Sequence, residues 1–305
     1  MILVVGEALV DVVRRPDSGT STHPGGSPAN VAVGLGRLGL PVDLAATVGH
    51  DDHGTVLRRH LETAGVRLLD GLRVPSRTAV AEATLADDGS ASYTFDLTWD
   101  PGAITPRTPP EILHTGSIAA YLSPGADAVE DLVRAHAPTS IVTFDPNVRP
   151  ALVPDREHAR RQVATFTRLA DIVKVSDEDL AWLEPDTDVD LVARRWLDDG
   201  PAAVVVTLGS RGARTYTHHG SLAMPSSPER VVDTVGAGDA FMSGLVGALV
   251  HEGLMGLTGS AELHAADLVL WRRVTAVAAR SAAIVVGRAG SQPPWREELF
   301  GGDGP

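Results

Sequence analysis

Short apolar stretches alternate with longer amphipathic stretches through most of the chain. Runs rich in Val, Ile and Leu are typical of buried strands, and apolar residues at helical spacing indicate helices packed on one face. This pattern predicts strands over residues 2–5, 42–48, 112–117, 140–145, 171–175 and 203–208. It predicts helices over residues 53–64, 125–137, 158–168 and 188–199, and a helical segment from 240 to about 286. Such alternation predicts an α/β fold with a doubly wound, mostly parallel central sheet flanked by helices.

The segment 73–97 has a different pattern. Two stretches of alternating apolar and polar residues flank Asp87-Asp88-Gly89, a sequence typical of a hairpin turn. A hairpin within an α/β chain predicts a small separate sheet, with strands from about 10–24 and 73–97 inserted in a single domain of residues 1–305. Such a sheet suits a lid that excludes water from an active site. The alternative is an edge hairpin without a function.

Composition narrows the function classes. A net charge of −13 and a pI near 5.2 argue against a nucleic-acid or anionic-membrane partner. The chain has no cysteine, which excludes disulfides and thiolate chemistry. Its apolar N-terminus lacks the basic region of a signal peptide, and no apolar run reaches transmembrane length. These observations predict a soluble, cytoplasmic protein.

Lysine and asparagine are nearly absent from the chain. Lys174 is the only lysine, and Asn30 and Asn147 are the only asparagines. A Walker A phosphate loop requires Gly-Lys-Ser/Thr, whereas Lys174 follows Val173, so that loop is excluded.

The segment Asp233-Thr-Val-Gly-Ala-Gly-Asp239 lies between a β-like run that ends at Val232 and a helical pattern that begins at Ala240. Its small residues therefore lie at a helix N-terminus, where unpaired amides and the helix dipole form an anion site. A carboxylate beside such a site is explained if the anion is a reacting phosphoryl group and Asp239 accepts the proton of the nucleophile. The alternative is an ordinary first-turn acid next to a tight turn.

A second glycine-rich helix start is predicted at Gly25-Gly26-Ser27-Pro28-Ala29-Asn30. Ser27 is expected at the N-cap and Pro28 at the first helical position, with Gly39 just after the helix end. The pattern Gly34-x-Gly36-x-x-Gly39 matches the dinucleotide-binding fingerprint, but it follows the helix start instead of opening the helix, so it does not indicate a dinucleotide site. Asp11 follows the first strand and is expected near the ligand crevice.

Three further loops follow predicted strands. The loop Asp145-Pro-Asn147-Val-Arg149 presents a guanidinium suited to phosphate or carboxylate, or alternatively a solvated arginine. The acids from Asp177 to Asp179 suit a water-mediated Mg²⁺ shell, or alternatively the first turn of a helix. The loop from Thr207 to Gly212 is a glycine turn, and His218-His219 is expected to be solvated in a hairpin.

The string Asp-Thr-x-Gly-Ala-Gly-Asp-x-Phe-x-Ser-Gly closely resembles the C-terminal signature of the PfkB (ribokinase-like) family of sugar and nucleoside kinases. The Gly-Gly-x-x-x-Asn string resembles the N-terminal motif of the same family, and the resemblance extends from Gly6 to about Trp295. It implies that Asp239 is the catalytic base and that amides of Gly236, Ala237 and Gly238 form the anion hole. It also implies a substrate site composed of Asp11, Gly25, Gly26, Asn30 and Arg149.

The resemblance extends to the nucleotide and the ions. It implies ATP contacts from Ser176, Thr207, Gly209, Gly212 and Gly238. Many members carry Asn-x-x-Glu, tied to magnesium and phosphate binding, where this chain has Ser176 and Asp179, so Asp179 is the Mg²⁺ candidate. Related kinases use a monovalent cation, which predicts K⁺ bound by carbonyls near Asp233, Val235 and Gly290.

The expected activity is therefore ATP-dependent transfer of a γ-phosphoryl group to a primary hydroxyl of a small sugar. Fructose is the first choice, because three of the short motifs together resemble those of fructokinases. The alternatives are a 2-keto-3-deoxygluconate kinase or a ribokinase, and, from a different class, a catalytically silent sugar-binding regulator. A homodimer formed through the small sheet is a further expectation.

Overall fold

The computed structural model describes residues 1–15, 19–85 and 91–301. The predicted turn at Asp87-Asp88-Gly89 lies outside the described residues. The central sheet has nine strands in the order β13-β12-β11-β10-β9-β8-β1-β4-β5, and all neighbours are parallel except the pairs made by β12. Its strands are β1 (Ile2–Val5), β4 (Val42–Ala45), β5 (Val66–Leu68), β8 (Ile112–Gly116), β9 (Ile141–Asp145), β10 (Ile172–Ser176), β11 (Ala203–Thr207), β12 (Ala213–Thr217) and β13 (Gly220–Met224).

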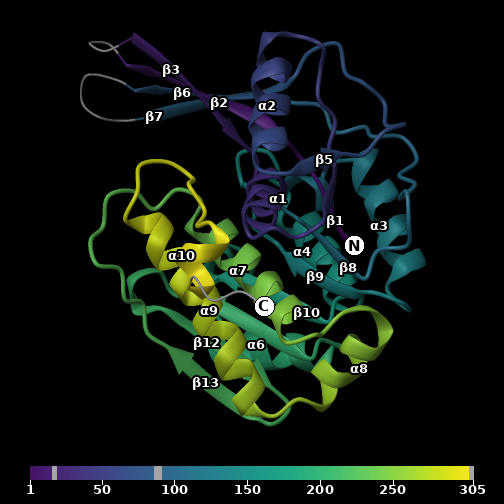
Figure 1. The fold of residues 1–305 in the computed structure, drawn as a ribbon, viewed down its shortest axis with the longest axis vertical. Helices are drawn as coiled ribbons and strands as arrows, with labels where there is room; N and C mark the ends of the chain where they lie inside the picture. Colours follow the sequence, from purple (N-terminus) through teal and green to yellow (C-terminus); the bar gives the residue numbers. More distant parts are fainter. Residues whose placement is uncertain (16–18, 86–90, 302–305) are drawn as a thin grey trace.

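Helices cover both faces of this sheet, as the doubly wound prediction requires (Figure 1). They are α1 (Ser27–Arg37), α2 (Asp52–Thr63), α3 (Gly125–His136), α4 (Arg156–Thr167), α5 (Asp177–Leu183), α6 (Val189–Asp198), α7 (Ala237–His251), α8 (Gly256–Ala265), α9 (Leu268–Val286) and α10 (Arg296–Phe300). Strand β1 shows how the core divides. Ile2 and Val4 pack with α1, α7 and α9, whereas Leu3 and Val5 pack with α3, α4 and α6.

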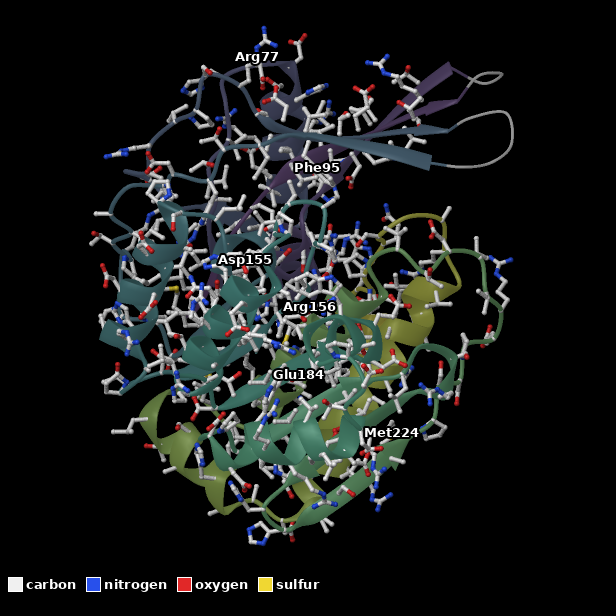
Figure 2. All side chains as sticks on the ribbon, turned by 180° about the vertical axis from the view of Figure 1, so that it is seen from behind. Arg77, Phe95, Asp155, Arg156, Glu184 and Met224 are labelled. Atoms are coloured by element: carbon white, nitrogen blue, oxygen red, sulfur yellow. The ribbon has the colours of Figure 1, made fainter. Side chains whose placement is uncertain are left out.

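The second of these faces is visible from behind the molecule (Figure 2). Asp155 caps the start of α4, because its carboxylate accepts hydrogen bonds from the amides of Glu157 and His158. Glu184, which follows α5, accepts a hydrogen bond from Arg195 of α6 at 2.7 Å. Caps and ion pairs at these helix ends therefore lie on the surface, while the buried side of the helices covers the sheet.

A small sheet projects from one end of the molecule (Figure 1). Its strand order is β3-β2-β6-β7, and the strands are β2 (Leu9–Arg15), β3 (Gly19–Gly25), β6 (Ala79–Leu85) and β7 (Ala91–Asp96). The register places Asp11 of β2 beside His23 on one side and Ala81 on the other, with Phe95 next to Ala81. Figure 2 shows Phe95 on this sheet. The separate small sheet predicted from the two segments is thus present.

Helices α1 and α7 pack closely because glycine lies between them. A Cβ atom on Gly34 would lie 2.3 Å from the Oγ of Ser243. Gly36 is equally restricted, since its Cβ would lie 2.1 Å from the carbonyl oxygen of Ala64. Gly39 follows the end of α1 with φ at +76°, as predicted for the residue after a helix. The glycine pattern that matches the dinucleotide fingerprint therefore serves helix packing and helix termination.

One prediction about secondary structure near the signature segment is wrong. The run that ends at Val232 is not a strand: β13 ends at Met224, and the amides of Val232 and Asp233 both donate to the carbonyl of Val286, the last residue of α9. Val231 and Val232 are exposed and have no partner strand in the described part of the chain, so their preference for β structure is not realised. The helical segment predicted from residue 240 to about 286 is present and comprises three helices, α7, α8 and α9. No single helix among the described residues is long and apolar enough to cross a membrane. The helices α7 and α8 reach the length and apolar composition of a membrane span only when they are taken together, and they are bent relative to each other.

Candidate active site

Asp239 lies in the first turn of α7 and is only 8% exposed. Its Oδ1 accepts a hydrogen bond from the Oγ of Ser27 at 2.7 Å, and its Oδ2 accepts one from the Nδ2 of Asn30 at 2.8 Å. Both donors come from the first turn of α1, three positions apart and therefore on one face of that helix. The two glycine-rich helix starts thus meet at this carboxylate.

The predicted N-cap role of Ser27 is wrong. The N-cap of α1 is Gly26, and Ser27 is already helical, with Pro28 as the next residue. Ser27 does not cap its own helix because its hydroxyl is directed to the charged Asp239, and hydrogen bonds to charged acceptors are the stronger kind. The sequence signal was ambiguous, because a serine next to a proline suits either position.

The N-terminus of α7 presents unpaired backbone amides. Among the described residues, the backbone amides of Gly236, Gly238 and Asp239 donate no hydrogen bond. The amide of Ala237 differs, since it donates to the carbonyl of Thr234 at 3.2 Å. Gly236 has φ at +77°, and a Cβ there would lie 2.2 Å from the Oγ of Ser291, so this turn requires glycine. Free amides at the start of a 15-residue helix form a site for an anion.

A cleft of about 800 Å³ opens at this helix N-terminus. It brings together most of the residues predicted for the nucleotide, the anion and the loop after β9. These are Arg149, Ser176, Asp179, Thr207, Gly209, Gly212, Val235, Gly236, Ala237, Gly238 and Asp239. Asp11, Gly25, Gly26, Asn30, Asp233 and Gly290 do not line this cleft. Asn30 is joined to it through Asp239.

Gly25 and Gly26 lie where a side chain would collide with the start of the chain. A Cβ on Gly25 would lie 2.1 Å from the Oδ2 of Asp11, and a Cβ on Gly26 would lie 2.6 Å from the carbonyl oxygen of Glu7. Gly26 also has φ at +98°. Asp11 is half-buried, and burial raises the pKa of its carboxyl, with His23 and Arg149 acting in the opposite direction. The glycines let β2 and α1 approach each other beside Asp11.

Glu7 was not predicted as a site residue from the sequence. It is 4% exposed and lies next to Gly26. Burial raises the pKa of its carboxyl to about 7, and Ser117 and Arg149 partly oppose this shift. Its Oε2 has no hydrogen-bond partner among the described residues. An acid directly after a buried strand was the available signal. Arg149 itself is exposed and donates to the carbonyl of Val148 at 3.1 Å.

Asp179 belongs to a capping box at the start of α5. Its Oδ2 accepts from the Oγ of Ser176 at 2.7 Å, while its Oδ1 accepts from the amide of Val148 at 2.9 Å. Asp177 pairs instead with Arg211. Within the described part of the chain, no group of three His, Asp or Glu residues is arranged to hold a metal ion. These residues fit an outer contact to a hydrated Mg²⁺ better than a direct protein cage.

The carboxylate of Asp233 organises the predicted monovalent-cation loop. Its Oδ1 accepts from the amide of Val235 at 3.0 Å, and its Oδ2 accepts from the amide of Gly290 at 2.9 Å. These amides lower the pKa of the Asp233 carboxyl. The three residues named for the cation are therefore adjacent, although Gly290 is 57 positions from Asp233.

The glycine loop after β11 forms the other wall of the cleft. Gly212 has φ at +89°, and a Cβ there would lie 2.0 Å from the carbonyl oxygen of Met224. The Oγ1 of Thr207 donates to the carbonyl of Val175 in the neighbouring strand at 3.4 Å. His218 and His219 lie in the β12–β13 hairpin and are exposed, as predicted.

The fold and this site define a class of protein. The model of the pfkB family of carbohydrate kinases matches residues 1–298, and the chain belongs to this family. It is 34% identical over 269 residues to a fructokinase of Rhizobium leguminosarum bv. trifolii, covering 84% of this chain and 81% of that protein.

Two solved structures share the fold closely. The first is the fructokinase of Xylella fastidiosa with bound ATP, at a TM-score of 0.80 and 27% identity, covering 95% of this chain and 93% of that one. The second is a double mutant of the fructokinase of Vibrio cholerae O395 with fructose, ADP and a potassium ion, at a TM-score of 0.77 and 25% identity, with the same coverage of both chains.

Proposed function

We propose that this phosphotransferase moves the γ-phosphoryl group of ATP to a primary hydroxyl of fructose. The observation that carries the proposal is the placement of the buried Asp239 carboxylate beside three free amides at one helix N-terminus. A base and an anion site at this separation suit an alcohol that attacks a phosphoryl group.

In the proposed reaction, the sugar hydroxyl oxygen forms a bond to the γ-phosphorus while the bond from that phosphorus to the leaving ADP oxygen breaks. Asp239 accepts the hydroxyl proton. Ser27 and Asn30 each occupy one lone pair of the carboxylate, which fixes its plane and leaves other lone pairs for the substrate. Such positioning lowers the entropic part of the barrier.

The amides of Gly236, Gly238 and Asp239 are proposed to receive the phosphoryl oxygens. They are fixed before the substrate arrives, because the αL turn at Gly236 is held by its packing against Ser291. Preorganised amides stabilise developing negative charge without the cost of reorienting water. The Ala237 amide would join them only by giving up its bond to Thr234.

The sugar is proposed to lie between Asp11 of the small sheet and Asn30 of α1, next to Asp239. The fructokinase relatives favour fructose. One observation favours a second candidate, a sugar acid such as 2-keto-3-deoxygluconate: among the described residues Arg149 donates only to backbone carbonyls, so its guanidinium is available to a carboxylate.

The nucleotide is proposed to occupy the wall formed by Ser176, Thr207, Gly209 and Gly212. Mg²⁺ would arrive with its phosphates and most of its waters, with Asp179 as an outer contact. K⁺ is proposed at the loop held by Asp233, which the potassium ion in the Vibrio cholerae structure supports by analogy.

The proposed homodimer would use the half-buried apolar residues Val13, Ala81, Ala83 and Phe95, which share one face of the small sheet. The cytoplasmic location stays a prediction.

A coupled assay of ADP release with fructose, ribose and 2-keto-3-deoxygluconate tests the proposal. The highest kcat/KM is expected with fructose. The highest value with 2-keto-3-deoxygluconate would overturn the choice of sugar and assign Arg149 to its carboxylate. Calorimetric binding of a sugar without turnover of any would identify a silent regulator instead.

A further inference from the structure

The single lysine of the chain lies directly beneath the anion site. Lys174 is in β10, at 4% exposure, and its Nζ donates to the Oδ2 of Asp145 in the neighbouring β9 at 2.7 Å. A Cβ atom built on Gly238 would lie 2.9 Å from this Nζ. The ammonium group therefore adjoins the residue whose free amide belongs to the anion site, and Lys174 lines the same cleft as Asp239.

The charges around Lys174 hold it protonated. Burial lowers the pKa of its ammonium, but Asp145, Asp239 and Asp179 together raise it above the ordinary value. His114 of β8 is also close, and burial together with Lys174 lowers the pKa of its ring to about 3, so it stays neutral. Within the described residues these are the titratable groups that face the ammonium.

Two features distinguish this lysine from an ordinary buried ion pair. First, the chain has 26 Lys and Arg residues, and only this one is lysine, so arginine fills the other basic positions. Second, the space beside Gly238 admits a compact ammonium, whereas a planar guanidinium is larger and has a fixed fork. Both features indicate a position that requires a small, rotatable cation with three donors.

We infer that Lys174 is a catalytic cation that donates a hydrogen bond to an oxygen of the phosphoryl group during transfer, while Asp145 fixes its position. The inference rests on the proposed kinase function. As the bond from the sugar oxygen to phosphorus forms and the bond to ADP breaks, Asp239 takes the hydroxyl proton and Lys174 keeps its own. Its charge offsets the three carboxylates that act on it, those of Asp145, Asp239 and Asp179.

The competing explanation is a structural ion pair, which would matter for folding alone. Removing one partner of such a pair is costly because the other stays buried and charged, whereas replacing both with apolar residues is often tolerated. Comparing the single and double replacements therefore separates the two explanations.

The variants are Lys174→Met and the double variant Lys174→Met with Asp145→Leu. Arg67→Met is the matched control, because Arg67 also pairs with a buried aspartate of a neighbouring strand, Asp43, at 2.8 Å, but outside the cleft. We expect kcat to fall about 100-fold or more in both Lys174 variants, a typical effect of removing one transition-state donor. KM for the sugar and affinity for ADP should change less than about threefold, and Arg67→Met should keep its kcat.

A folded double variant that turns over within about threefold of the wild type would overturn the inference. A second measurement needs no variant. Wild-type protein labelled with ¹⁵N-lysine gives one side-chain ammonium signal, since Lys174 is the only lysine. That signal should shift when ADP, aluminium fluoride and fructose are added together, and much less with ADP alone. A signal that does not move although the analogue binds would equally overturn it. Wild-type protein that phosphorylates no sugar would instead contradict the proposed function.

Discussion

The side-chain amide of Asn30 lies 2.8 Å from a carboxylate oxygen of Asp239, although 209 positions separate the two residues. With Ser27 on the other oxygen, the first turns of α1 and α7 share one carboxylate. The proposed catalytic base and part of the proposed substrate site are therefore held together by the packing of two helices.

Replacing Asp239 with Asn should cut kcat by about 10²–10⁴-fold, the usual contribution of a general base. Asn is nearly isosteric but cannot take the hydroxyl proton. If Asp239 only balanced the helix dipole, its loss would cost at most about 1 kcal/mol of stability and leave turnover unchanged. Steady-state kinetics and urea unfolding of the same variant distinguish the two roles, and turnover within a few-fold of the wild type would exclude Asp239 as the base.

Ser27→Ala should lower kcat by roughly 10-fold with little change in the KM for the sugar. The hydroxyl contacts the Asp239 carboxylate, and one hydrogen bond to a charged group contributes about 1.5–3 kcal/mol. Thr63→Ala is a suitable control, since it removes a hydroxyl that bonds only to a carbonyl on the exposed side of α2. A rise in KM at constant kcat would show that Ser27 contacts the sugar instead.

Gly34→Ala should reduce the free energy of unfolding by about 1–3 kcal/mol, because the added Cβ overlaps Ser243. Adding Ser243→Gly should recover part of this loss, less the roughly 1 kcal/mol that glycine costs in a helix. Denaturant unfolding of the single and double variants measures the coupling. Strictly additive effects would mean that the two helices separate instead of clashing.

The carboxyl of Glu7 should make stability depend on pH. Its pKa is raised from 4.5 to about 7 in the folded protein, so the folded state binds the proton more tightly than the unfolded state. Stability is therefore lost as the pH rises from about 4.5 to about 7. Relative to Glu7→Gln, the free energy of unfolding of the wild type should fall by about 3 kcal/mol across this range. Parallel pH profiles of the two proteins would contradict the burial of a lone carboxyl.

K⁺ should increase kcat relative to tetramethylammonium. A cation at the loop held by Asp233 would fix the conformation of that loop, and with it the positions of the free amides of Gly236, Gly238 and Asp239. Asp233→Ala should abolish this response, since it removes the acceptor for the amides of Val235 and Gly290. Assays at constant ionic strength, with Na⁺ excluded, provide the measurement. Equal rates in both salts would remove the cation from the proposal.

The α/β fold was predictable because its strands are apolar and its helices amphipathic, two signals that depend only on neighbouring residues. The small sheet was predictable from the alternating segment 73–97. The β-like run before Asp233 misled because valines favour a strand only when a partner strand is available. In the structure the amides of Val232 and Asp233 donate to the carbonyl of Val286, a contact that β propensity cannot predict.

The candidate site was predictable as far as its motifs are contiguous. Asp239 and the amides beside it follow from one string of residues. The contacts of Ser27, Glu7 and Lys174 depend on how separate elements pack, so their sequence context gave only hints: a serine before proline, an acid after a strand, and a unique lysine. Partners that come from separate elements can be named only once the fold is known.

The connection of the small sheet to the rest of the chain has a mechanical consequence. Strand β2 follows β1 after only Gly6, Glu7 and Ala8, and β3 leads to α1 through Gly26. Asp11 therefore belongs to the small sheet, and Asn30 and Asp239 belong to helices on the central sheet, with two short connections between these elements. A sugar that contacts all three residues would bridge the small sheet and the two helices, and its size would set the angle between them. A shorter or longer sugar would therefore displace the whole small sheet, in addition to misplacing its own hydroxyls.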